Sequence, residues 1–138
     1  MKIDLQDHDV VRLGTNEAAE AGAQVALVGF PEFNDSSSAT ITTGVISNIS
    51  RRLPDEKEVY FQTDAATNGG NSGGPLCLSN GQVIGVIVAK YTGGRAKNLP
   101  ENTNLAIRID DVRKFLSQEL GKDYAETHIV LDEPQDKD

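Results

Sequence analysis

Short apolar runs separated by turn residues occupy most of the chain, and they predict an antiparallel β structure. Six segments are rich in the aliphatic, β-branched and aromatic residues that favour strands. They are residues 24–30, 40–49, 58–63, 76–78, 82–90 and 104–109. Gly44 interrupts the second segment and predicts a bulge or a tight bend there. Asn80-Gly81, between the fourth and fifth segments, is a strong signal for a two-residue hairpin turn.

One helix and a polar tail are predicted after the last strand. Asp110 is a typical N-cap residue, and Gly121 lies where a C′ glycine belongs. Apolar residues share one face between them at helical spacing: Val112, Phe115, Leu116 and Leu120. Six short strands and a terminal helix predict a small antiparallel barrel over residues 1–121. Residues 122–138 are mostly polar, and we expect a partly disordered tail there.

Composition narrows the classes of function. A chain of 138 residues with 38% hydrophobic and 25% charged residues is typical of one soluble domain. The net charge of −8 argues against binding to nucleic acid or to anionic membranes, and no apolar run is long enough for a membrane span. One cysteine and two histidines exclude an internal disulfide and a zinc cluster, so no metal or cofactor is expected. We interpret Cys77, in an apolar run, as a buried strand residue rather than a reactive thiol.

The stretch from Thr63 to Pro75 carries the candidate chemistry. It reads Thr-Asp-Ala-Ala-Thr-Asn-Gly-Gly-Asn-Ser-Gly-Gly-Pro, with four glycines in the six residues around Ser72. Glycines permit positive φ angles and remove the Cβ atoms that would block a ligand. A serine held in such a turn can expose its Oγ while backbone N–H groups converge beside it, as a nucleophile and an oxyanion hole require. The alternative is a plain Gly/Asn/Ser loop between two strands.

The order of residues in this stretch resembles a known family. Residues 70–75, Gly-Asn-Ser-Gly-Gly-Pro, resemble the nucleophile loop of trypsin-like (chymotrypsin-fold) serine proteases, and residues 62–66 with Asn68 are similar to the HtrA-type branch. Further matches follow in the same order at residues 12–14, 22–31, 43–47, 83–85 and 105–111. The resemblance covers roughly residues 2–120. It implies the second of the two barrels of a trypsin-like protease, a six-stranded antiparallel Greek-key barrel with a C-terminal helix.

The resemblance implies a role for each residue of the serine loop. Ser72 would attack the scissile carbonyl, and the N–H groups of Gly70 and Ser72, on either side of Asn71, would form the oxyanion hole. Many trypsin-like enzymes carry an aspartate at the position of Asn71, where it pairs with a newly cut N-terminus. An amide cannot form that ion pair, which is similar to the HtrA-type and bacterial glutamate-specific branches.

The resemblance also implies a substrate-binding pocket. Ala66 would lie at its base, and Ile87, Val88 and Ala89 would form its wall. Asn104 takes a position that the family usually gives to glycine or another small residue, so its side chain would shorten the pocket. Apolar walls favour small aliphatic side chains. For Ala66, Ile87 and Val88, plain packing in the core is the alternative interpretation.

The general base is the missing part. In the family, the histidine and aspartate of the triad come from the first barrel, and the motif that carries the aspartate is expected just before Lys2 but is absent. His8 and His128 lie in polar stretches, and we interpret both as surface residues. The sequence therefore predicts the C-terminal half of a serine endopeptidase, inactive alone, with the triad histidine and aspartate upstream of Met1.

Two other functions stay open. The chain could be a peptide-binding pseudoprotease module that uses the pocket without cutting, or a hydrolase of the same fold that acts on esters. The partners expected for the endopeptidase are a peptide or unfolded-protein substrate and the missing N-terminal barrel. Self-association of the isolated half is also expected, by pairing of exposed faces or by exchange of residues 1–14. The family resemblance implies a secreted or cell-envelope location.

Overall fold

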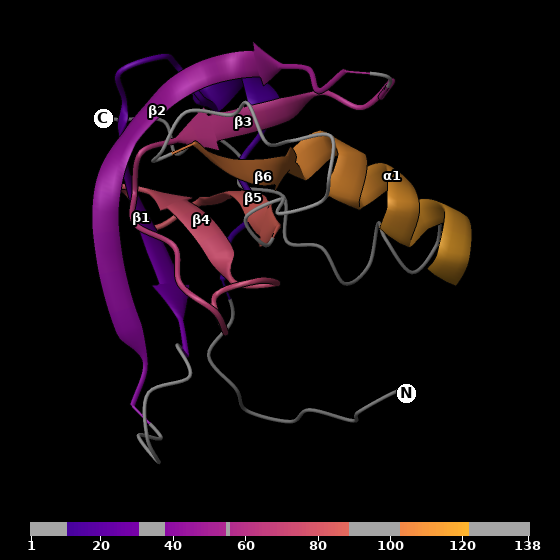
Figure 1. The fold of residues 1–138 in the computed structure, drawn as a ribbon. Helices are drawn as coiled ribbons and strands as arrows, with labels where there is room; N and C mark the ends of the chain where they lie inside the picture. The colour runs from indigo at the N-terminus through magenta and orange to yellow at the C-terminus, as the bar shows by residue number, and fades with distance from the viewer. Residues whose placement is uncertain (1–10, 31–37, 55, 89–102, 122–138) are drawn as a thin grey trace, which may run out of the picture.

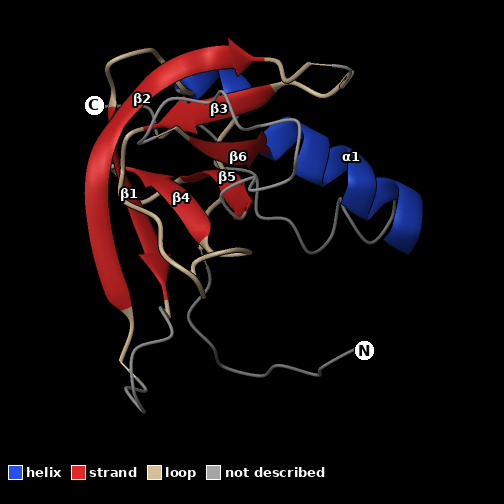
Figure 2. Ribbon diagram, in the orientation of Figure 1, coloured by secondary structure: helices blue, strands red, loops and turns tan. Residues whose placement is uncertain are grey.

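The chain folds into a closed barrel of six antiparallel strands with one helix at its end (Figures 1 and 2). The computed structural model describes residues 11–30, 38–54, 56–88 and 103–121. The strands are β1 (Gln24–Gly29), β2 (Thr40–Arg51), β3 (Tyr60–Thr63), β4 (Pro75–Leu78), β5 (Val83–Val88) and β6 (Asn104–Arg108). A short 3-10 helix, η1 (Asn16–Ala18), precedes them, and α1 (Ile109–Leu120) follows. The predicted tail, residues 122–138, lies outside the described residues.

The order of the strands confirms the predicted Greek-key barrel. Around the barrel they run β1-β2-β3-β6-β5-β4, and β4 pairs with β1 to close it. β4 therefore returns beside β1 after three consecutive neighbours, which is the Greek-key order 4-1-2-3. The predicted hairpin turn joins β4 and β5, where the Gly81 N–H donates to the Leu78 carbonyl at 2.9 Å. The connection from β3 to β4 carries Ser72.

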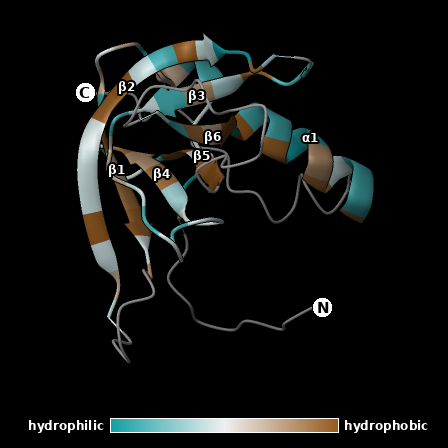
Figure 3. Cartoon of the chain, in the orientation of Figure 1, coloured by the Kyte–Doolittle hydropathy of each residue, from teal (hydrophilic) through white to brown (hydrophobic). Residues whose placement is uncertain are grey.

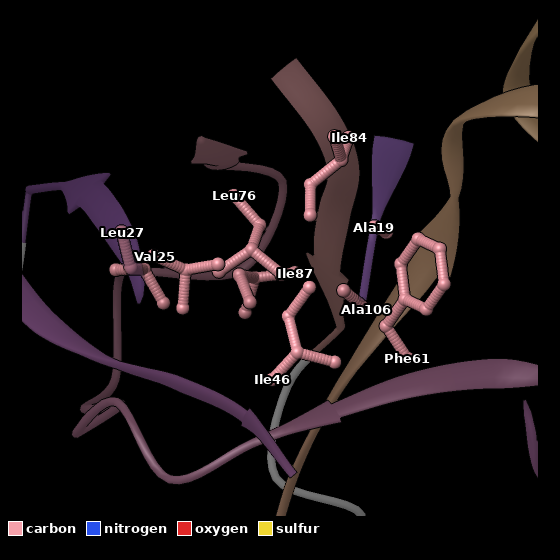
Figure 4. Packing of buried hydrophobic residues seen from close by; sticks show 9 residues of the cluster. All are labelled: Ala19, Val25, Leu27, Ile46, Phe61, Leu76, Ile84, Ile87 and Ala106. Carbon is pink, nitrogen blue, oxygen red and sulfur yellow. The ribbon is translucent and has the colours of Figure 1, made fainter. Parts of the chain in front are cut away.

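The core of the barrel is a single cluster of buried apolar side chains (Figure 4). It consists of Ala19, Val25, Leu27, Ile46, Phe61, Leu76, Ile84, Ile87 and Ala106. All six strands contribute to it, because every second residue of a strand faces inward. Figure 3 shows hydrophobic residues along β1, β4, β5 and β6, the strands that supply most of the cluster.

Gly44 does not form the predicted bulge. It pairs with Val25 of β1 in an unbroken register, and the irregularities in β2 lie further on, in its pairing with β3 between Ile46 and Arg51. Gly44 instead provides space, because a Cβ atom there would lie 2.4 Å from Asp64 Oδ1. The long, curved β2 pairs with β1 over its first half and with β3 over its second (Figure 1).

The predicted face of α1 is largely unburied. The helix begins at Ile109, with Arg108 as N-cap, so Asp110 is not the cap residue. Ile109 is its only buried residue, while Phe115 is 59% and Leu120 45% exposed to solvent. Figure 1 shows the reason, because the helix leaves the barrel and its later turns lie away from the strands. No helix in the described ranges is long and apolar enough to cross a membrane.

The start of α1 holds the segment that precedes the barrel. Asp110 and Asn16 exchange hydrogen bonds through their side chains and backbone N–H groups. Arg113 donates to the carbonyl oxygens of Leu13 and Gly14, and Leu13 forms a parallel bridge with Val83 of β5. Residues 12–16 are thereby fixed against the same chain.

Candidate active site

Ser72 is exposed in the connection between β3 and β4. The residue before it, Asn71, is buried, and the residue after it, Gly73, has a φ of 84°. L-residues other than glycine rarely adopt that angle, so the glycine is required for the turn that follows the serine. The loop therefore presents the Ser72 side chain outward, while its neighbour on the N-terminal side faces the protein.

Two backbone hydrogen bonds attach this loop to β5. The Gly73 N–H donates to the Ile87 carbonyl at 2.8 Å, and the Ile87 N–H donates to the Gly74 carbonyl at 2.9 Å. They continue the β4–β5 pairing beyond Pro75, which lies opposite Val86. Ser72 consequently has a fixed position relative to the wall strand predicted from the sequence.

The backbone donors around Ser72 are not equivalent. The Asn71 N–H donates to the Asn68 carbonyl at 3.2 Å and is occupied. The N–H groups of Gly70 and Ser72 make no hydrogen bond with any other described residue. Of the three residues predicted for the oxyanion hole, Gly70 and Ser72 thus have available donors, and Asn71 connects them.

A hollow of about 390 Å³ opens beside Ser72. Residues of the serine loop and of β5 line it: Thr67, Asn68, Gly69, Asn71, Ser72, Ile87 and Val88. Two of the three predicted wall residues are among them, although Ile87 is also buried in the core cluster. The third, Ala89, lies outside the described residues. Sequence reasoning missed Thr67, Asn68 and Gly69, and the only signal for them was their place between Ala66 and Ser72.

Side chains hold the segment between β3 and the serine loop. Beyond Thr63 the chain leaves the ladder with β2, and the Asp64 carboxylate accepts a hydrogen bond from the Val45 N–H at 2.7 Å. The Thr63 hydroxyl donates to the Val45 carbonyl, and the Thr42 hydroxyl donates to the carbonyl of Ala66, each at 2.8 Å. Ala66 itself is exposed, and it is not among the described residues that line the hollow.

Asn104 contacts the same segment from β6. It is 4% exposed, its Nδ2 donates to the Ala65 carbonyl at 2.8 Å, and its Oδ1 accepts from the Thr67 hydroxyl. Thr67 lines the hollow, whereas Asn104 is absent from the lining within the described ranges. Asn104 therefore lies behind Thr67 and can influence the hollow only through it.

The remaining candidate groups are placed as follows. The described part of the chain contains no histidine, because His8 and His128 both fall outside it. It also contains no cluster of three potential metal ligands. Cys77 lies half-buried on β4, and this burial raises the pKa of its thiol, so little of it is thiolate at neutral pH. Ser72 is thus the nucleophile candidate that the hollow serves.

The barrel and the serine loop define the class, and comparison with known proteins agrees. The chain belongs to the trypsin-like peptidase family, since the model of the trypsin-like peptidase domain matches residues 1–86. Within the family it is of the HtrA type, as its relatives indicate. This confirms the resemblance found in the sequence of the serine loop.

The relatives are longer proteins. A DegP-like periplasmic serine endoprotease of Marinomonas sp. (strain MWYL1) is 39% identical over 164 residues, which cover 99% of this chain and 34% of that protein. Its counterpart in Pseudomonas putida (strain W619) is 34% identical over 149 residues, 97% of this chain and 30% of that protein. Serine protease HTRA1 of Xenopus tropicalis is 38% identical over 114 residues, 79% of this chain and 22% of that protein. The chain spans about a third or less of each relative.

Proposed function

We propose that this chain is the nucleophile-bearing half of an HtrA-type serine endopeptidase that cleaves peptides or unfolded proteins. The observation that carries the proposal is the setting of Ser72, which is exposed at a hollow of about 390 Å³. The N–H groups of Gly70 and Ser72 beside it have no acceptor among the described residues. A pseudoprotease that only bound peptides would have no need of an exposed hydroxyl in this position.

Each residue then has a step to perform. Ser72 Oγ attacks the scissile carbonyl, and the N–H groups of Gly70 and Ser72 donate to the oxyanion that forms. The proton of Ser72 must pass to a base, and no histidine lies in the ranges that the structure describes. We therefore propose that a preceding first barrel supplies the histidine and aspartate of the triad. The relatives are named periplasmic endoproteases, which favours a cell-envelope location for this protein too.

The hollow beside Ser72 would bind the side chain before the cut bond. Ile87 and Val88 give it an apolar wall, and Thr67 is held by Asn104 on its other side. The pocket predicted from the sequence was built on Ala66, Ile87, Val88, Ala89 and Asn104. With Asn104 behind the lining, we propose that it limits the depth of the pocket by fixing Thr67.

Cleavage of a peptide library by the two-barrel protein tests both the reaction and the pocket. We expect preference for small apolar residues such as Val, Ala or Thr before the cut bond, because the wall is apolar and no charged side chain lines the described hollow. The control is Ser72→Ala, which should remove cleavage altogether. A preference for Arg, Lys or Glu would contradict the pocket, and cleavage that persisted in Ser72→Ala would contradict the reaction.

The matched variant for specificity is Asn104→Gly. It removes both hydrogen bonds that hold the segment 65–67 from β6, so the pocket should accept larger apolar side chains. A methylene is worth about 1–3 kcal/mol in such a pocket, and the preference for Val over Leu should fall by roughly tenfold. An unchanged preference would show that Asn104 does not act on the pocket.

Self-association of the isolated chain is a second proposal, resting on its exposed apolar residues. Phe115 is 59% and Leu120 45% exposed on α1, and Val11 and Ile41 are more than half exposed elsewhere. Exposed apolar surface of a few hundred Å² usually finds a partner. Sedimentation of the 138-residue chain should show a species larger than a monomer, and Phe115→Ser should shift it toward the monomer. A monodisperse monomer at high concentration would contradict the proposal.

A further inference from the structure

The side chain next to the proposed nucleophile points the opposite way. Residues 68, 69, 70, 72 and 73 of the loop are all exposed, whereas Asn71 is 1% exposed. Asn71 is therefore the only residue of that run whose side chain the loop inserts into the protein. Its Oδ1 is buried and accepts no hydrogen bond from the residues that the structure describes. A buried amide oxygen without a donor is unfavourable, so hydrogen bonding does not account for its position.

Close packing against Gly29, the last residue of β1, does account for it. A Cβ atom built on Gly29 would lie 2.3 Å from Asn71 Oδ1, 2.9 Å from its Cγ and 3.0 Å from its Cα. These separations are too short for any side chain at residue 29 to coexist with Asn71 in this position. The backbone of Gly29 is thus the surface on which the Asn71 amide rests.

The backbone of Asn71 continues this anchor into the loop. Its N–H donates to the Asn68 carbonyl at 3.2 Å, and its carbonyl accepts from the Gly74 N–H at 3.0 Å. The side chain and both backbone groups of Asn71 are therefore engaged, while the residues on either side of it are exposed. Fixing Asn71 in this way fixes the orientation of the two peptide units that carry the Gly70 and Ser72 N–H groups.

We infer that Asn71 is a positioning residue for Ser72, and that Gly29 is the seat that holds it. The amide packed on the end of β1 keeps the Gly70 and Ser72 N–H groups directed away from the barrel, beside the hollow. The inference rests on the proposed role of Ser72 as nucleophile. It predicts that a single methyl group on β1 disturbs the serine loop, and that shortening Asn71 relieves the disturbance.

Amide hydrogen exchange of the 138-residue chain, followed by NMR, tests this without requiring activity. The Asn71, Gly73 and Gly74 amides are hydrogen-bonded and report on the loop. In Gly29→Ala we expect their exchange to accelerate by about tenfold or more, because the added methyl displaces Asn71. The Gly81 amide, in the turn between β4 and β5, should not change. The matched control is Gly69→Ala, where the added methyl meets no atom within 4 Å and the Gly73 and Gly74 amides should exchange as before.

The double variant Gly29→Ala/Asn71→Ala decides whether the contact is the cause. The new methyl occupies space that the amide leaves, so exchange at Gly73 and Gly74 should return to within about threefold of the unmodified chain. Unchanged exchange in Gly29→Ala, or strictly additive effects in the double variant, would overturn the inference. If Gly29→Ala does not fold, a folded double variant supports the contact and an unfolded one contradicts it.

Labelling of Ser72 by a fluorophosphonate probe in the two-barrel protein separates this inference from the proposed function. We expect Gly29→Ala to slow labelling and the double variant to recover part of the rate. No labelling in the unmodified two-barrel protein would overturn the proposed function, while the exchange results would still judge the contact. Normal labelling in Gly29→Ala would overturn the positioning role.

Discussion

Peptide hydrolysis by the 138-residue chain alone is expected to be about 10⁴- to 10⁶-fold slower than by the two-barrel protein. A serine hydroxyl is almost wholly protonated at neutral pH, and without a positioned base it is a weak nucleophile. What remains is the contribution of the oxyanion donors and the hollow. Turnover of a peptide substrate and fluorophosphonate labelling, measured on both proteins side by side, give the ratio.

The control for this result is Ser72→Ala in both proteins. It should abolish labelling of the two-barrel protein and leave the chain alone at its background rate. Efficient turnover and Ser72 labelling by the chain alone would overturn the proposal that a first barrel supplies the base. His8 and His128 would then be the residues to replace, since they are its only histidines.

Most of the barrel could be predicted from the sequence because its strands are bounded by strong turn signals. The Asn80-Gly81 hairpin and the strand before it were predicted from local residues alone, and the structure confirms them. The face that β2 buries was not predictable in this way. Ile41 and Ile49 alternate with polar residues, yet they are 65% and 43% exposed, and Ile46 on the other face is buried. Pairing with β1 decides this, and pairing is a property of the whole barrel.

The helix shows a second limit of the same kind. Its apolar spacing and Gly121, which has a φ of 86°, were predicted correctly as a helix and its end. Spacing reports which residues share a face, but it does not report what covers that face. Phe115 and Leu120 share the predicted face and remain exposed, because α1 leaves the barrel.

The candidate site divides in the same way between local and distant contacts. The exposed serine and its glycines follow from six consecutive residues, so the sequence was sufficient for them. The depth of the hollow depends on Asn104 reaching Thr67 across 37 positions, and the seat of Asn71 lies at Gly29. No local pattern predicts either contact. The sequence therefore predicted the candidate nucleophile, and the structure adds what holds it.

The largest expected effect on stability comes from a single residue on the strand that leads to this site. Phe61 is 1% exposed, is among the largest fully buried side chains, and lies opposite Ala106 of β6. One of its ring carbons would be 3.7 Å from a Cβ atom on Gly85, so β5 also lies close to it. Removing the ring loses its burial and leaves a cavity between these strands, which barrel neighbours can close only in part.

We therefore expect Phe61→Ala to lower the free energy of unfolding by about 3–5 kcal/mol, a large share of the roughly 5–15 kcal/mol of a typical domain. Urea unfolding measures it as a lower midpoint with an unchanged m-value. Phe30→Ala is the matched control, because Phe30 is 59% exposed and its loss should change stability by no more than about 0.5 kcal/mol. Equal effects of the two substitutions would contradict the packing of Phe61. Because Phe61 precedes Thr63 and Asp64 by two and three residues, the same variant should also loosen the segment that holds the hollow, and exchange of the Val45 amide, bonded to Asp64, should accelerate with the loss of stability.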